Sequence, residues 1–365
     1  TYLNNPNYLE QIIDPRGKSV IRTEYDERGR VKATKDALGN TISNNYSIAT
    51  DGSSTTQIDP LGGITTTVRD NRGNIVSTIS PIGAVRRYTY DASNNQISET
   101  DPRGFTITRA YDAQGNITSL TEPLGVTNSF TYDKFNNIET ATDSLGRTLT
   151  YVYDSEGNLV QITDPVGGKG QFTSDELGRV TSFFDPNSNT TTFVFGSNPS
   201  SSQIVDKPTQ VLFADGSTRK FEYNEFGQVS RTIDENGYET TFVTDSIGRL
   251  LKQQDHLGNE ITYQYEAQNL ISATDPLGNV TKFEYDDASQ LIRRIDPLGG
   301  VTLFSYDALG RLITETDALG RTTTITYCTC GSVSSITDPA GNITSFEYDL
   351  SGNRTAVISP LGQRT

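Results

Sequence analysis

The chain has 365 residues, with 30 Lys or Arg against 45 Asp or Glu, and its formal net charge is −15 at pH 7. This acidic balance, without a basic patch or stripe, argues against nucleic-acid binding. No apolar run approaches the ~20 residues of a membrane-spanning helix, so we expect no membrane span in this segment. The chain contains no Met and shows no signal peptide. We interpret it as a segment of a longer protein whose export signal lies elsewhere.

A word of the form Asp-x-x-Gly recurs along the whole chain, from Asp14 to a variant that starts at Ser359. Twelve of the sixteen steps between successive words are 21 residues long. A second word of the same kind follows a Tyr about halfway through each period, for example YDAQGN from Tyr111. Repetition at a fixed period of this length is typical of repeat architectures. We therefore predict a single continuous repeat array over residues 1–365.

Both words have the composition of a β-turn. An Asp at the first position can cap the turn with its side chain, a Pro at the second presets φ, and a Gly fits the fourth position of a type I turn. The structural positions that we expect in these words are Tyr111, Asp112, Gly115, Tyr153, Asp154, Gly157, Tyr285, Asp296, Pro297, Gly299, Tyr306, Asp307, Gly310, Asp317, Gly320 and Tyr348.

The segments between the turns are short and rich in Thr, Val, Ile, Tyr and Phe, which favours strands. In 301–306, for example, Thr302, Phe304 and Tyr306 share one face and the residues between them share the other. Short turns between neighbouring strands indicate antiparallel hairpins, one per repeat. A strip of about 34 strands is too long to stay open and flat. We therefore expect it to coil into a tube or spiral with its aromatic face inward.

Together, the two words give the pattern YDxxG[NR]xxxxxDPxGxxTxxxYD, which is legible from Tyr285 to Asp307. The pattern resembles the tyrosine-aspartate (YD) repeat of the rearrangement-hotspot (RHS) family, over essentially the whole chain. Similar repeats occur in bacterial RHS polymorphic toxins, encapsulating components of insecticidal toxin complexes, wall-associated bacterial proteins and animal teneurins. The resemblance implies an all-β fold in which antiparallel hairpins form a spiralling strip that closes into a hollow shell. In toxins such a shell holds a C-terminal effector.

The sequence departs from this pattern at two places. One step between words is 28 residues long, and the Ser-, Pro- and Asn-rich stretch 194–217 inside it predicts an irregular, longer loop. Several toxin members carry an autoprotease segment after the last repeat, but nothing after Ser359 resembles it. We therefore carry over no cleavage residues, and the sequence predicts no catalytic, cofactor-binding or metal-binding residue.

Four features besides the two cysteines could carry chemistry, and each has a simpler structural interpretation. His256, the single histidine, stands where other repeats have Pro, and no motif supplies it with catalytic partners. The turn aspartates could bind calcium, but each turn offers a single carboxylate, so capping explains them better. The tyrosines could stack on a ligand, although packing within the wall explains them better. Asp286 and Asp287 are adjacent, and neighbours on a strand or turn point apart.

Cys328 and Cys330 replace part of a Tyr-Asp turn in the stretch YCTCG. A Cys-x-Cys pair is only half of a four-ligand zinc site, and no second pair is visible. A disulfide across one intervening residue is possible but strained. We favour two free thiols in the turn and leave the disulfide as the alternative.

These observations lead to one principal hypothesis and one alternative. The chain is expected to be a non-enzymatic β-shell segment, without a cofactor, that encloses and protects a toxin or effector cargo. The alternative is an extended extracellular fibre or cell-surface adhesion protein built from the same repeats. The expected partners are further repeats of the same kind and a protein cargo, and the expected location is outside the cell or on its surface.

Overall fold

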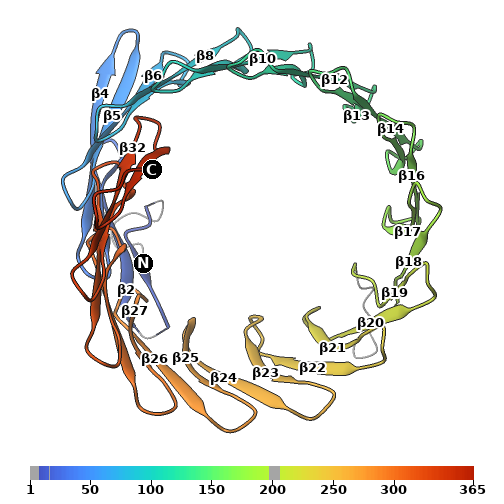
Figure 1. Cartoon of the computed structure of the whole chain (residues 1–365). Coiled ribbons are helices and arrows are strands. Elements are labelled where there is room, and N and C mark those ends of the chain that lie inside the picture. The colour runs from blue at the N-terminus through green and yellow to red at the C-terminus, as the bar shows by residue number, and fades with distance from the viewer. Residues whose placement is uncertain (1–7, 16, 197–205) are drawn as a thin grey trace. The chain divides into compact units, whose positions relative to one another are not determined.

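The computed structural model describes residues 8–15, 17–196 and 206–365, and in these residues every regular element is a β-strand. Thirty-three strands join in one hydrogen-bonded sheet, and successive strands follow one another as hairpins (Figure 1). The prediction of an all-β strip of antiparallel hairpins is therefore confirmed. Among the described residues there is also no helix long and apolar enough to cross a membrane.

The strands of the first half of the chain are β1 (Gln11–Ile13), β2 (Ser19–Tyr25), β3 (Val31–Asp36), β4 (Thr41–Ala49), β5 (Gly52–Ile58), β6 (Ile64–Asp70), β7 (Ile75–Ile79), β8 (Val85–Tyr90), β9 (Gln96–Thr100), β10 (Thr106–Tyr111), β11 (Ile117–Thr121), β12 (Thr127–Tyr132), β13 (Ile138–Thr142), β14 (Thr148–Tyr153), β15 (Leu159–Thr163), β16 (Lys169–Ser174) and β17 (Val180–Phe184). Those of the second half are β18 (Thr190–Val194), β19 (Gln210–Leu212), β20 (Thr218–Tyr223), β21 (Val229–Ile233), β22 (Glu239–Thr244), β23 (Leu250–Gln254), β24 (Glu260–Glu266), β25 (Asn269–Thr274), β26 (Val280–Tyr285), β27 (Leu291–Ile295), β28 (Val301–Tyr306), β29 (Leu312–Thr316), β30 (Thr322–Tyr327), β31 (Val333–Thr337), β32 (Ile343–Tyr348) and β33 (Arg354–Ile358).

The chain forms two compact units. The first contains Thr1–Ile107, Tyr265–Ser272 and Val280–Thr365, and the second contains Thr108–Gln264 and Ala273–Asn279. Each unit is made of the same hairpins.

The two kinds of turn join their strands in different registers. The turn at Asp317 is of the first kind, which does not follow a Tyr. Across it, Thr316 pairs directly with Thr322 and the ladder is regular. Across the turn that follows a Tyr, the register shifts by one residue: Ser305 pairs with Thr314, whereas Tyr306 pairs with Leu312. A β-bulge of this kind bends its strand and increases the local right-handed twist. The bulge therefore accompanies the Tyr of the repeat.

The sheet is a single layer, so few side chains are fully buried. Among the described residues the buried apolar side chains are Ala33, Ala84, Val211, Tyr223 and Ala356. In β28, Thr302 is buried and Phe304 and Tyr306 are half-buried, whereas Leu303 is exposed. Val301 and Ser305, which share the predicted face of Leu303, are half-buried as well, so the exposures separate the two faces only in part.

The segment that we expected as an irregular loop, 194–217, is shorter than predicted. Strand β19 lies inside it and pairs with β18 on one side and β20 on the other. A turn of the usual kind follows, in which the backbone N–H of Gly216 donates to the carbonyl of Phe213. Strand β19 has only three residues, and the Ser- and Pro-rich composition around it did not indicate a strand. Residues 197–205 of the predicted loop lie outside the described part of the chain.

Candidate functional site

The repeated turns share one backbone geometry. In the turn at Asp307 the N–H of Gly310 donates to the carbonyl of Asp307, and the N–H of Asp307 donates to the carbonyl of Arg311, both at 2.9 Å. Gly310 has φ 76°. This is a type I turn followed by a left-handed residue, a common three-residue hairpin loop. The turns at Asp296 and Asp317 have the same two bonds. Pro297 fits the second position because no bond requires its N–H.

An Asp at the first position caps its own turn, and both carboxylate oxygens accept hydrogen bonds where the fifth residue is Arg or Asn. Asp307 Oδ1 accepts from the N–H groups of Leu309 at 2.9 Å and Arg311 at 3.0 Å, and Oδ2 accepts from Arg311 Nε at 2.8 Å. Where the fifth residue is Asn, its amide takes the place of the guanidinium, as Asn116 does on Asp112 at 2.9 Å. Asp154 and Asp317 are capped in the same way by their own fifth residues.

The role of the fifth residue was not predicted from the sequence. Its signal was present, because many of the words end in Gly-Asn or Gly-Arg. Both side chains can donate back to the Asp from this position and also reach the neighbouring repeat. Arg311 packs over the ring of Tyr327, with the guanidinium carbon 4.2 Å from the ring centroid. In an Asn repeat the corresponding link is a hydrogen bond, from Asn116 Nδ2 to Asn136 Oδ1 at 2.9 Å.

The Tyr that precedes a capped turn joins one hairpin to the previous one. The hydroxyl of Tyr306 donates to the carbonyl of Leu291 at 2.8 Å, and that of Tyr348 donates to the carbonyl of Val333 at 2.9 Å. The accepting residue lies fifteen positions earlier and opens the return strand of the preceding hairpin. We call this bond the tyrosine latch. It is also made by Tyr90, Tyr132, Tyr153 and Tyr327. Tyr46, inside β4, and Tyr223, whose acceptor Pro208 precedes β19, make the same bond fifteen positions back.

Tyr111 and Tyr285 occupy the same position, at the ends of β10 and β26. Burial raises the pKa of Tyr285 above the usual value for a phenol, as it does for Tyr153 and Tyr306. These hydroxyls therefore stay protonated and able to donate at any physiological pH. At the latch positions with a printed acceptor, such as Tyr306 and Tyr348, the phenol packs its ring while its hydroxyl donates to a carbonyl, which explains Tyr rather than Phe there.

Capping lowers the pKa of several turn aspartates, among them Asp112, Asp307 and Asp317. For Asp112 the largest cause is the hydrogen bond from the Asn116 side chain, and for Asp317 it is the one from Arg321. For Asp307 burial alone would raise the pKa, but the hydrogen bonds from the side chain and backbone of Arg311 lower it overall. For Asp101 desolvation likewise opposes the shift, but its hydrogen bonds outweigh desolvation and lower the pKa to about 2.

These shifts predict that the fold loses stability in acid. A carboxylate whose pKa is lower in the folded state binds fewer protons there than in the unfolded state. Its contribution to the stability of the fold is therefore complete at pH values above its pKa in the unfolded chain, near 4. It is lost as pH falls through the folded values, which reach about 2 for Asp101. We expect the urea concentration at the midpoint of unfolding to stay constant between pH 7 and 5 and to fall between about pH 4 and 2. Measurement in 0.5 M NaCl screens the net charge of −15. A midpoint unchanged down to pH 2 would contradict the capping role.

The left-handed residue of the turn gives a second prediction. Gly299 has φ 86°, and a Cβ added there would meet nothing within 4 Å, so a substitution meets only backbone strain. Gly299→Ala should lower the free energy of unfolding by about 1 kcal/mol. Asn94 and Asn136 hold φ 67° in equivalent turns, so Gly299→Asn should cost less than half as much. Urea titrations of the two variants compare them directly, and an equal cost would show that φ is not what selects Gly.

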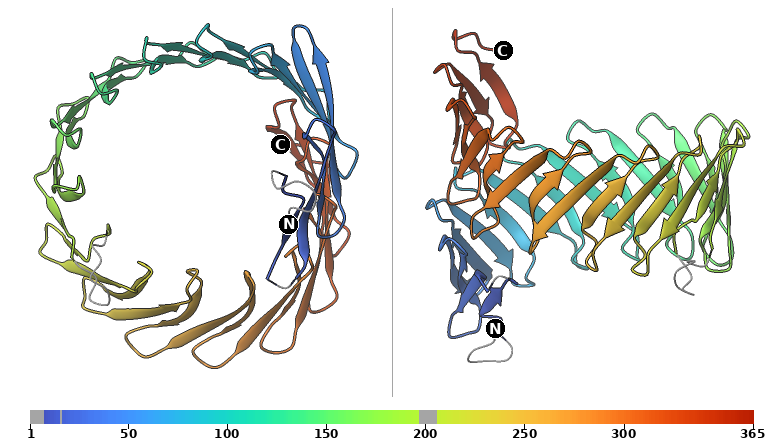
Figure 2. Two further views of the ribbon diagram at one scale, coloured as in Figure 1. Left: turned by 180° about the vertical axis from the view of Figure 1, so that it is seen from behind. Right: turned by 90° about the horizontal axis from the view of Figure 1, so that it is seen from below.

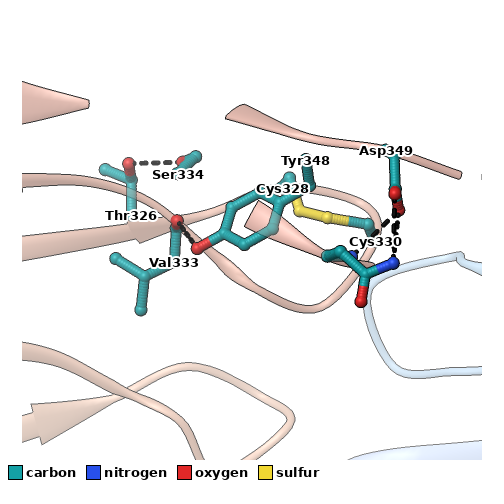
Figure 3. Close-up of a disulfide and its surroundings, with 8 residues drawn as sticks. Thr326, Cys328, Cys330, Val333, Ser334, Tyr348 and Asp349 are labelled. Carbon is teal, nitrogen blue, oxygen red and sulfur yellow. Dashed lines mark hydrogen bonds between the residues drawn. A yellow bond between two sulfur atoms is a disulfide. The ribbon is translucent and has the colours of Figure 1, made fainter. Parts of the chain in front are cut away.

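Cys328 and Cys330 form a disulfide, so the expectation of two free thiols is wrong (Figure 3). Their turn keeps the usual frame, in which Gly331 N–H donates to the carbonyl of Cys328 and Cys328 N–H donates to the carbonyl of Ser332. The disulfide joins the first and third residues, which elsewhere are joined by the bond from the third N–H to Asp Oδ1. The turn's fixed geometry brings the two Cα atoms to 5.1 Å, within disulfide range.

In this turn the disulfide takes the place of the Asp cap, and this exchange can be tested. We expect a reductant to lower the stability of the parent chain by about 1 kcal/mol. The double variant Cys328→Asp, Cys330→Ala restores the usual word, so it should match the oxidised parent and ignore the reductant. Thermal unfolding with and without reductant measures both. If the double variant stays at the level of the reduced parent, Asp does not replace the disulfide.

The remaining candidate residues have structural partners. The His256 ring stacks on Tyr238 with ring centroids 4.1 Å apart. Asp286 caps its own turn, whereas Asp287 forms an ion pair with Lys18, so the two carboxylates act separately. No group of three or more His, Cys, Asp or Glu side chains able to hold a metal ion occurs in the part of the chain that the structure describes.

The comparisons with known proteins agree with this architecture. Residues 245–280, 266–301, 285–322 and 331–364 match the RHS Repeat model, and residues 85–210 match the Teneurin YD-shell model. No curated protein matches the chain.

Among solved structures, this chain is similar to a protein chain in the mutated Photorhabdus luminescens Tc holotoxin pore. The two share 16% identity with a TM-score of 0.75, and the match covers 94% of this chain and 21% of that chain. This chain is also similar to one in TcdB2-TccC3, with 16% identity and a TM-score of 0.61 over 97% of this chain and 24% of that chain. This chain therefore spans about a fifth to a quarter of the length of those proteins. At this identity the likeness concerns the fold. The matches, the repeat pattern and the hairpin strip together confirm the resemblance, and the chain is an array of RHS/YD repeats.

Proposed function

We propose that the chain is a wall segment of an RHS/YD-repeat shell that encloses and protects a toxin or effector cargo. The longer protein would act outside the cell or at its surface. The observation that carries this proposal is the tyrosine latch, which recurs from Tyr46 to Tyr348 and ties a hairpin to the one before it. In a wall, such links would add to the backbone ladder and resist the separation of neighbouring hairpins.

The mechanism would be steric. A protease requires an extended, accessible stretch of backbone, whereas here the backbone is hydrogen-bonded to strands on both sides along the sheet. Within the residues that the structure describes, the hairpin turns are the more accessible segments, and in most of them an Asp cap holds turn N–H groups, as Asp307 does. A continuous sheet of this kind also has few free edges.

The turn carboxylates support a structural role over a catalytic one. A general acid or base needs a pKa near the working pH, which burial or a like charge supplies by raising that of a carboxylate. Capping does the opposite at Asp112, Asp154 and Asp317, whose pKa values are lowered. Both oxygens of these groups already accept hydrogen bonds, so they serve the turn itself.

The proposal is tested by proteolysis of the full-length protein. The cargo inside should survive a protease concentration that degrades the free cargo within minutes. The double variant Tyr306→Ala, Tyr327→Ala removes two successive latches and should make the cargo sensitive. Tyr238→Ala is the matched control, because Tyr238 is half exposed and lies in a turn rather than at a latch position. A cargo as sensitive in the intact protein as when free would contradict the proposal.

An extended extracellular fibre is the second candidate. The uniformity of the repeats supports it, because latches and caps are the same near both ends of the array. A fibre would give the same protection of the strip itself but would have no cargo to protect.

A further inference from the structure

The turn of Cys328 and Cys330 differs from the other turns in a property other than its stability. An Asp at the first position caps the same frame elsewhere, as Asp307 does, without a cysteine. The disulfide spans a single intervening residue, so it restricts the unfolded chain little and adds little to the stability of the fold. What a pair of cysteines provides, and an Asp does not, is a bond that thiols break and reform.

Folding gives this disulfide little protection against thiols. The free energy by which the disulfide stabilises the fold equals the free energy by which folding favours the disulfide over two thiols. Since the first is small for so short a ring, the second is small as well. Both cysteines are half-buried, and Thr329 between them is exposed. Accessible disulfides are the ones that exchange readily with thiols, whereas those that folding strongly favours resist reduction.

The backbone of the turn holds the two cysteines together without help from the sulfur atoms. Gly331 N–H donates to the carbonyl of Cys328 at 3.0 Å, and Cys328 N–H donates to the carbonyl of Ser332 at 2.9 Å. Tyr327, just before the turn, is latched to Leu312. The Cα separation of 5.1 Å depends on this frame, so the reduced turn should keep its two thiols within reach of each other. The disulfide can then reform without a change in the fold.

Cys330 is also one of the residues that line a pocket of about 260 Å³, whereas Cys328 is not. The pocket belongs to the first unit and is formed by the stretches 65–102 and 330–352, which Figure 2 draws in blue to blue-green and in red. Its apolar lining residues are Pro81, Ile82, Ala84, Pro102 and Leu350. The volume is just below that of pockets for drug-sized ligands, so it suits a smaller molecule. A thiol of low molecular mass can therefore reach Cys330 through this pocket.

We propose that the Cys328–Cys330 disulfide is a redox-active site that exchanges with a small thiol, and that Cys330 is the cysteine under attack. A thiolate RS⁻ attacks Cys330 Sγ, the bond to Cys328 Sγ breaks, and a mixed disulfide between RS and Cys330 forms. Cys328 leaves as a thiolate and takes a proton from water. A second thiolate attacks the sulfur of the bound RS group, which releases RSSR, and the Cys330 thiolate is protonated in turn. The protein gains two electrons and two protons, and two thiols become one disulfide.

This chemistry gives the turn two states. It is closed by the disulfide where thiols are scarce and holds two thiols where they are abundant. The proposal applies to a shell wall and to a fibre alike, so it does not depend on which function is correct.

The first test places the full-length protein in buffers with increasing ratios of glutathione to glutathione disulfide, followed by an acid quench and alkylation. Trypsin releases residues 322–354 as one peptide with both cysteines, because no Lys or Arg lies between Arg321 and Arg354. Its mass then counts the free thiols. The reduced fraction should rise with the ratio and fall again when glutathione disulfide is restored, with an unchanged circular dichroism spectrum. A disulfide that stays closed at every ratio, or a reduced turn that does not close again, would overturn the proposal.

Single-cysteine variants test which cysteine is attacked. Cys328→Ser keeps Cys330 and should form a mixed disulfide with glutathione disulfide at least about threefold faster than Cys330→Ser, because exchange depends on access to the sulfur. In urea the two variants should react at the same rate. Equal rates in the folded protein would contradict the assignment of Cys330.

A change in the pocket itself completes the test. Ile82→Trp, added to Cys328→Ser, narrows the pocket and should slow the reaction with glutathione disulfide. Leu309→Trp is the matched control, because Leu309 also occupies the third position of a turn but does not line the pocket. It should leave the rate unchanged, and equal slowing by the two would show that the pocket is not the route. Failure of these tests leaves the cargo-protection experiment unaffected.

Discussion

Replacing Tyr223 by Ala should lower the free energy of unfolding by about 3–5 kcal/mol, the largest effect of any single substitution that we predict. Tyr223 is 4% exposed, which makes it the most buried aromatic residue among those described. Its hydroxyl donates to the carbonyl of Pro208 at 2.8 Å, and Lys207 approaches its ring. The substitution removes a packed ring and a latch at once, and it does so beside the segment where the repeat spacing is longest.

Two variants separate the ring from the hydroxyl. Tyr223→Phe keeps the ring and leaves the Pro208 carbonyl without its donor, so it should cost about 1 kcal/mol. Tyr238→Ala removes a Tyr that is half exposed, and it should cost less than about 1 kcal/mol. Because a repeat array can open locally, hydrogen exchange in β19 and β20 should be read together with the urea midpoint. Equal exchange in Tyr223→Ala and the wild type would show that the latch does not hold these strands.

Replacing Asp307 by Ala should cost about 2 kcal/mol, because it leaves two turn N–H groups without their acceptor and frees Arg311. The Asp307 carboxylate is largely buried and accepts from Leu309 and Arg311, so solvent replaces these bonds incompletely. The loss should spread to the next hairpin, since the position of Arg311 over Tyr327 depends on Asp307.

The controls for this substitution come from the chain itself. Asn224 stands at the same position in its turn, and its Oδ1 still accepts from the N–H groups of Phe226 and Gln228. Asp307→Asn should therefore keep the backbone cap and lose only the ion pair with Arg311, at less than half the cost of Ala. Asp287→Ala removes a half-exposed ion pair and should cost less than about 0.5 kcal/mol. Urea unfolding ranks the three variants, and a cost for Asp307→Asn equal to that of Ala would mean that the charge, and not the cap, stabilises the turn.

The repeat and the strands could be predicted from the sequence because they depend on residues close together in it. Asp at the first position and Gly at the fourth select a turn locally, and the alternation in 301–306 favours a strand without reference to any other element. The family resemblance followed from the same local pattern.

The features that the sequence did not reveal depend on contacts between repeats. The latch joins residues fifteen positions apart, and the packing of Arg311 on Tyr327 crosses from one hairpin to the next. The pair Arg103–Asp349 joins residues 246 positions apart, which no periodicity specifies. The disulfide was missed because the strain expected of Cys-x-Cys applies to an average backbone, whereas this turn brings its first and third residues close together.

The most direct test of the central claim is electron microscopy of the full-length protein purified from its native source. The proposal predicts closed, hollow particles with density inside them. Continuous filaments without enclosed density, in which these repeats stack along an axis, would contradict it and establish the fibre instead.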